Sequence, residues 1–87
     1  MALRNAIDNF YERLAQDAIV ATQEDTDTAD YLVDVMCVAL NRLPGRYYRH
    51  SIDMLFYLAD EELKEMKATT LAAVKAARVF VREHQRE

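Results

Sequence analysis

Residues 41–50 read Asn41-Arg42-Leu43-Pro44-Gly45-Arg46-Tyr47-Tyr48-Arg49-His50 and hold the only proline and the only glycine of the chain. Proline fixes φ near −65° and glycine accepts positive φ without steric cost, so the Pro-Gly pair predicts a turn. Long stretches with helical periodicity lie on both sides of it. The sequence therefore predicts a helical protein organised around this turn.

Length and composition indicate one small globular domain, residues 1–87. Hydrophobic residues make up 52% of the chain and charged residues 30%, which excludes disorder. A chain of this size buries only about 60–65% of its unfolded surface, so oligomerisation often completes the core. No apolar run reaches the ~18 residues of a membrane span, and the start of the chain lacks a signal-peptide pattern. We expect a cytoplasmic protein without membrane contact, and the net charge of −4 argues against stable DNA binding.

The first third of the chain predicts a helix and a linker. Apolar residues recur every three or four positions from Leu3 to Ala18, which predicts an amphipathic helix that ends near Val20 or Thr22. The polar and acidic residues 23–28 then form a linker. They lack the glycine and the distal glutamate of a calcium-binding loop, so we expect capping instead, with Thr28 or Asp27 at the start of the next helix.

The predicted helix over 29–42 is apolar on almost its whole circumference, interrupted only by Asp30, Asp34 and Asn41. Such a helix must be buried on most of its sides, and the rest of so short a chain could scarcely cover it. A second copy of the protein is the expected cover, so we predict a homodimer. Cys37 lies within this run as the only cysteine, which excludes an internal disulfide and a zinc site, and we expect it to be a small buried hydrophobe.

The last third predicts one ambiguous segment and one long helix. Residues 47–58 fit a short helix capped by Ser51 or an extended segment near 52–58. Asp60 is a predicted N-cap, and a packing seam recurs every three or four residues from Leu63 to His84. Arg78, Arg82 and Arg86 suit the negative end of that helix. The predicted fold class is all-α or mainly helical, a three- to four-helix domain that forms a homodimer.

No catalytic motif is present: the chain has no Gly-rich phosphate loop, no H-E-x-x-H and no G-x-S-x-G. We therefore expect neither an enzyme nor a cofactor or metal. The remaining chemistry lies in the turn. Arg42, Arg46 and Arg49 offer planar forks that bind phosphate oxygens, and Tyr47 and Tyr48 offer faces on which bases stack, at roughly 1–3 kcal/mol per base.

Two interpretations of this cluster stay open on composition. In the first, the arginines and tyrosines bind a small nucleotide. In the second, the arginines pair with the acids of residues 24–34 and the tyrosines pack under the last helix. The residues alone do not choose between a ligand site and a structural element.

Residues 34–47 resemble the hallmark of the late-competence ComFB family, an aspartate-led apolar helix followed by A-L-N-x-L-P-P-x-Y. Here the motif is Ala39-Leu40-Asn41, then Leu43-Pro44 and Tyr47, and the likeness covers about residues 3–82. Gly45 stands where the family usually has a second proline. The resemblance implies a small, mainly helical homodimer without catalysis, associated with natural competence and with type IV pilus or surface behaviour. Some relatives hold a metal with several cysteines, which does not carry over to a chain with Cys37 alone.

The resemblance also implies a ligand, because some family members are receptors for cyclic dinucleotides, chiefly cyclic di-GMP. Two phosphates and two guanines match the arginines and tyrosines of the turn. The expected ligand-binding residues are Asn41, Arg42, Arg46, Tyr47, Tyr48, Arg49 and His50. We expect Arg42, Arg46, Tyr47, Arg49 and His50 of both subunits to bound one composite pocket near the two-fold axis. A downstream protein partner is expected but not identified, and the alternative function is a protein-binding adaptor dimer without a nucleotide ligand.

Overall fold

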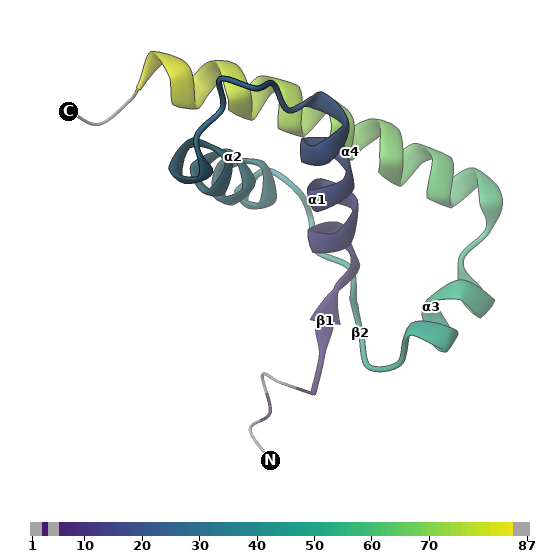
Figure 1. Cartoon of the computed structure of the whole chain (residues 1–87). Helices are drawn as coiled ribbons and strands as arrows, with labels where there is room; N and C mark the ends of the chain where they lie inside the picture. The colour runs from purple at the N-terminus through teal and green to yellow at the C-terminus, as the bar shows by residue number, and fades with distance from the viewer. Residues whose placement is uncertain (1–2, 4–5, 85–87) are drawn as a thin grey trace.

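The computed structural model describes Leu3 and residues 6–84, apart from the side chain of Leu55. In this part the chain runs through β1 (Asp8–Asn9), α1 (Phe10–Thr22), α2 (Ala29–Asn41), β2 (Tyr47–Tyr48), α3 (Ser51–Tyr57) and α4 (Asp60–Glu83). The predicted mainly helical fold is confirmed. Helices α1 and α2 pack against each other and against α4, whereas β1, β2 and α3 lie toward one end (Figure 1).

Helix α1 begins at Phe10, so the predicted start near Leu3 is wrong. Asn9 has an extended backbone, and its Oδ1 accepts a hydrogen bond from the Tyr11 N–H at 3.2 Å, which makes it the N-cap. Ile7, which continued the apolar periodicity, is exposed and lies outside the helix. Residues 4 and 5 of the predicted helix lie outside the described residues.

The linker and α2 follow the sequence prediction closely. Thr28 is the residue that caps α2, because its Oγ1 accepts the Tyr31 N–H at 3.1 Å. Asp30 lies in the first turn, where a negative charge favours the positive end of the helix. At the other end Arg42 is the C-cap, and its N–H donates to the carbonyls of Ala39 and Leu40.

Residues 51–57 form a helix, so the alternative of an extended segment near 52–58 is wrong. Met54 is buried while Ile52 and Phe56 are exposed, a one-sided burial that a short helix produces against a core. The predicted caps are also wrong by one residue: His50 and Ala59 hold the extended N-cap backbone, and Ser51 and Asp60 are the first helical residues. The short extended segment is instead β2, which pairs antiparallel with β1.

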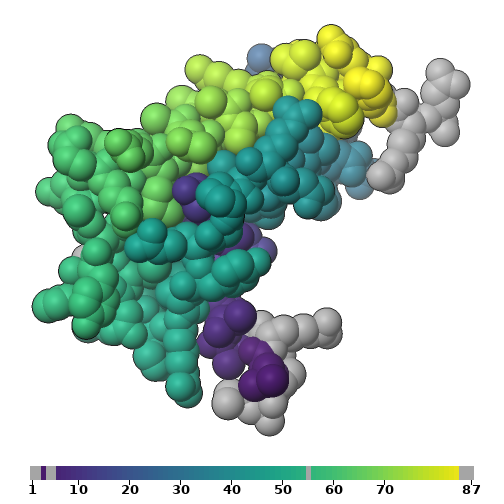
Figure 2. Space-filling model, turned by 180° about the vertical axis from the view of Figure 1, so that it is seen from behind, coloured from purple at the N-terminus to yellow at the C-terminus, as the bar shows by residue number. Residues whose placement is uncertain are grey.

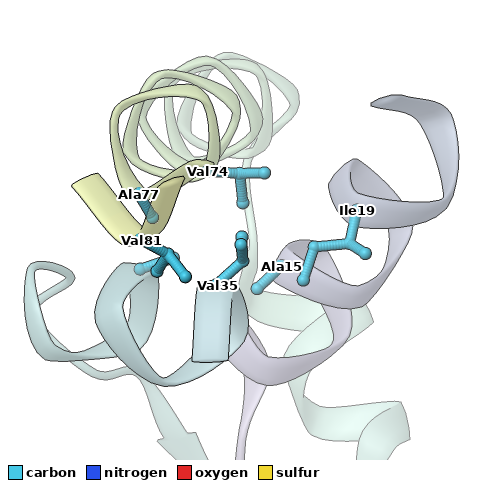
Figure 3. Close-up of a cluster of buried hydrophobic side chains, with 7 residues drawn as sticks. Ala15, Ile19, Val35, Val74, Ala77 and Val81 are labelled. Carbon is cyan, nitrogen blue, oxygen red and sulfur yellow. The ribbon is translucent and has the colours of Figure 1, made fainter. Parts of the chain in front are cut away.

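The core consists of two clusters that share α1. One contains seven residues from α1, α2 and α4, which converge in Figure 3: Ala15, Ile19, Val35, Ala39, Val74, Ala77 and Val81. The other contains five residues from α1, α3 and α4: Phe10, Tyr11, Leu14, Met54 and Met66. The first half of α1 thus packs against α3 and the start of α4, and its second half packs against α2 and the later part of α4.

Helix α4 buries a face that passes through Met66, Thr70, Val74, Ala77 and Val81. The predicted seam is confirmed at three of its positions (Met66, Thr70 and Ala77) and wrong at its C-terminal end, where Phe80 is 40% exposed and His84 is exposed. α4 is the longest described helix, yet no helix of the described residues combines the length and the apolarity needed to cross a membrane.

Candidate ligand-binding site

The predicted site lies where the chain leaves α2 and enters β2. Gly45 adopts φ +52°, a left-handed conformation that an L side chain rarely takes. The backbone of Arg46 is then held on both sides: its N–H donates to Asn9 Oδ1 at 2.8 Å, and its carbonyl accepts the Phe10 N–H at 2.7 Å. Together with the pairing of Tyr47 with Asn9 and of Tyr48 with Asp8, these bonds fix the exit of the turn against the start of α1.

Sequence reasoning missed Asn9, although it organises the site. One carboxamide oxygen accepts two N–H groups, one from Tyr11 in α1 and one from Arg46 across the turn. An asparagine immediately before an apolar periodic segment is an N-cap signal, and this signal was present in the sequence. The second bond joins residues 37 positions apart and carried no local signal.

Arg42 and Arg46 point to different parts of α4. The Arg42 guanidinium lies 5.2 Å from the centre of the Phe80 ring, whereas Arg46 Nη2 lies 3.1 Å from Glu62 Oε1. Phe80 and Glu62 are 18 residues apart, about 27 Å at 1.5 Å per residue. The structure therefore places the Arg46 side chain, which directly precedes β2, near the start of α4, and the Arg42 side chain near the C-terminal end of α4. Asn41 is exposed at the end of α2.

About two fifths of the Arg46 side chain and of the Glu62 side chain are exposed, although Glu62 Oε1, the oxygen of the ion pair, is buried. Water screens such a pair, so its contribution to stability is below about 1 kcal/mol. Among the described residues the ion pairs are Arg46–Glu62 and Arg78–Asp27, so the alternative pairing of the turn arginines with the acids of residues 24–34 is not formed there.

The two tyrosines of β2 differ in exposure, as successive residues of a strand do. Tyr47 is 65% exposed. Tyr48 is half-buried, and its ring meets Phe10 edge-on at 6.2 Å between centroids. Arg49 and His50 follow on the surface. The ring available for stacking on a base is therefore Tyr47. The structural interpretation expected both tyrosines to pack under the last helix, whereas Tyr47 is exposed and the ring of Tyr48 contacts Phe10 of α1.

The linker is attached to α4 by a buried ion pair. Arg78 Nη2 lies 2.9 Å from Asp27 Oδ2, and both side chains are more than nine-tenths buried. The guanidinium also lies 5.3 Å from the ring centre of Tyr31, whose hydroxyl donates to the Arg78 carbonyl at 3.0 Å. The Glu24 N–H, and after it the Arg78 guanidinium, hold the pKa of Asp27 below its ordinary value despite burial. Of the three arginines expected to suit the negative end of α4, Arg82 lies in its last turn, Arg78 instead forms this buried ion pair, and Arg86 lies outside the described residues.

A separate groove of about 600 Å³ lies between α2 and the C-terminal part of α4. Its apolar lining includes Val33, Val38 and Phe80, and its polar lining includes Asp34 and His84. No predicted ligand-binding residue within the described ranges is among those that line it.

Cys37 also lines this groove and is exposed, so the prediction of a buried cysteine is wrong. Residues of a helix follow at about 100° intervals, and the buried stripe of α2 passes through Val35 and Ala39. Cys37 lies two residues from each of them, on the opposite side of the helix.

The fold and the turn define a class, a small mainly helical domain that presents a basic and aromatic turn at its surface. The chain belongs to the late competence development protein ComFB family, whose family model matches residues 8–85. The resemblance identified from the sequence is thereby confirmed, and the chain is a competence-related regulatory protein. Searches of curated proteins and of solved structures found no match.

Proposed function

We propose that this chain is a non-catalytic, cytoplasmic regulatory homodimer that binds a cyclic dinucleotide, cyclic di-GMP first, at the turn from Arg46 to His50. One observation carries the proposal: Tyr47 is exposed on β2, directly after Arg46 and two residues before the exposed Arg49, in a ten-residue segment without a single acid. The net charge of the chain is −4, so this concentration of arginine is local. The resemblance to ComFB proteins supplies the ligand class.

Each group has a defined task in this proposal. Arg49 is exposed and offers its fork to one phosphate. Tyr47 offers a ring to one guanine. Arg46 meets the ligand by exchanging the carboxylate of Glu62 for a phosphate, while its backbone stays bonded to Asn9. The site thus combines a fixed backbone with two exposed side chains, Tyr47 and Arg49, and with Arg46, which leaves its ion pair when the ligand binds.

Calorimetry with cyclic di-GMP, cyclic di-AMP and a linear dinucleotide tests the proposal. We expect Arg49→Ala to weaken cyclic di-GMP binding by about tenfold or more, because a hydrogen bond to a charged group contributes roughly 1.5–3 kcal/mol. Arg13→Ala is the matched control, since Arg13 is an exposed arginine on α1. Tyr47→Ala should also weaken binding through lost stacking. Absence of heat with every cyclic dinucleotide at high micromolar concentration would contradict the proposal.

A protein-binding adaptor is the second candidate function, and α3 is the observation that favours it. Ile52, Phe56 and Tyr57 are 72%, 81% and 76% exposed on one short helix, an unusual concentration of apolar surface. If no nucleotide binds, substitutions in α3 should abolish capture of the downstream partner while Arg49→Ala leaves it unchanged.

A further inference from the structure

An acid of the chain's own already holds the guanidinium of Arg46. The Arg46 Nη2 atom lies 3.1 Å from Glu62 Oε1, and this contact joins the exit of the turn to the first turn of α4. In the space-filling view the segments on either side of the ion pair lie next to each other on one side of the molecule, in neighbouring shades of teal and green (Figure 2). A ligand phosphate that binds Arg46 must therefore compete with Glu62.

Charge attraction holds this acid, because the contact lacks hydrogen-bond geometry. Glu62 Oε1 is buried, and no donor among the described residues forms a hydrogen bond with it, so the charge of Arg46 compensates its lost hydration. The Glu62 side chain as a whole is 43% exposed, which leaves the carboxylate room to turn toward water. Glu62 can therefore leave Arg46, but it gives up the attraction of the guanidinium when it does.

The first turn of α4 contains two more acids that differ from Glu62 in this contact. Asp60 and Glu61 are exposed, and like Glu62 they favour the positive end of the helix. Within the described residues, Glu62 is the acid of this turn that forms an ion pair. A change at Glu61 therefore removes the same charge from the same turn of α4 and leaves the contact with Arg46 intact.

We propose that Glu62 is an affinity-determining residue of the nucleotide site, an internal counter-ion that a ligand phosphate must displace from Arg46. This rests on the proposed function, because it requires that Arg46 binds the phosphate. When the phosphate arrives, the Glu62 carboxylate faces a like charge and turns toward solvent. Glu62 is absent from the residues predicted to bind the ligand, and its effect has the opposite sign to theirs, because it lowers the affinity.

Arginine modification tests the ion pair in the chain without nucleotide. Phenylglyoxal reacts with accessible guanidinium groups, and peptide mapping by mass spectrometry gives the rate at each arginine. Glu62→Gln should raise the rate at Arg46 by about threefold or more, relative to the exposed Arg49 as internal reference. Glu61→Gln is the matched control and should leave the rate at Arg46 unchanged. An equal rate at Arg46 in Glu62→Gln and in the unaltered chain overturns the inference.

Calorimetry with cyclic di-GMP tests the competition itself. We expect Glu62→Gln to tighten binding by about three- to fivefold, the range that an ion pair of this exposure allows, and Glu61→Gln by less than about twofold. In a chain that also carries Arg46→Ala, Glu62→Gln should bring no gain, because the competition acts through Arg46. An equal gain with and without Arg46 would indicate general charge repulsion and overturn the inference.

Failure of this inference can be told apart from failure of the proposed function. If Arg49→Ala weakens binding while Glu62→Gln binds as the unaltered chain does, the nucleotide site stands and the role of Glu62 is refuted. If neither the unaltered chain nor Glu62→Gln gives heat with any cyclic dinucleotide, both are refuted, whatever the rate of modification at Arg46.

Discussion

Replacing Asn9 tests the central structural link between α1 and the candidate site. In Asn9→Ala, α1 loses its N-cap, which costs about 1 kcal/mol. The Arg46 N–H loses its acceptor at 2.8 Å in a half-buried position, which costs about 1 kcal/mol more. Together the free energy of unfolding should fall by about 2 kcal/mol. For a domain of this size that corresponds to a melting temperature lower by about 8–16 °C.

Asn9→Asp is the informative companion variant. Aspartate keeps an oxygen in the same place, caps helices as well as asparagine does, and places a negative charge at the helix N-terminus. We expect its stability to stay within about 0.5 kcal/mol of the unaltered chain. Gln16→Ala, an exposed change on α1, should likewise have little effect.

Thermal denaturation followed by circular dichroism, at one fixed protein concentration, measures these differences. Calorimetry with cyclic di-GMP adds a second readout, because Asn9→Ala removes one of the two hydrogen bonds that hold the backbone of Arg46 and should weaken binding without removing any ligand contact. If Asn9→Ala and Gln16→Ala have the same melting temperature, the Asn9 carboxamide does not hold the turn, and the argument for a preorganised site is refuted.

Two further predictions concern the turn and the linker. In chemical denaturation, Gly45→Ala should lower the free energy of unfolding by about 1–2 kcal/mol because φ is +52°, and the exposed Tyr47 ring, 2.9 Å from the new Cβ, can move and adds little. Gly45→Pro should lower it more, since proline cannot adopt positive φ. Equal stability of the unaltered chain and both variants would contradict the assigned conformation. The pKa of Asp27 is lower in the folded chain than its ordinary 3.8, so the interactions of its carboxylate stabilise the fold above that pH and are lost as the pH falls through the folded pKa. Asp27→Asn should therefore be less stable than the unaltered chain at pH 7, and the difference in unfolding free energy should narrow below about pH 4. A difference that does not change with pH would exclude the ion pair with Arg78 as its cause.

Local chemistry was sufficient to predict the middle of the chain from sequence. The linker at 23–28, the cap at Thr28 and the end of α2 all depend on interactions within a few residues. The Pro-Gly pair likewise imposes a turn through its own backbone geometry, and the motif around it carried the family. Such features are visible because a side chain that bonds to its own neighbours needs no knowledge of the rest of the fold.

The candidate site and the exposed surfaces depend on contacts between residues far apart in the sequence, so they could be seen only in the folded chain. Asn9 reaches Arg46 across 37 positions, and Arg78 reaches Asp27 across 51. Periodicity marked α2 as apolar all round but could not say which side its own chain would cover, and so it misjudged Cys37. Arg42 and Arg46 are four residues apart in sequence, but a turn between them sends their charges toward opposite ends of α4. Sequence spacing translates into spatial spacing only within one regular element, and here the chain changes direction at the residues that matter.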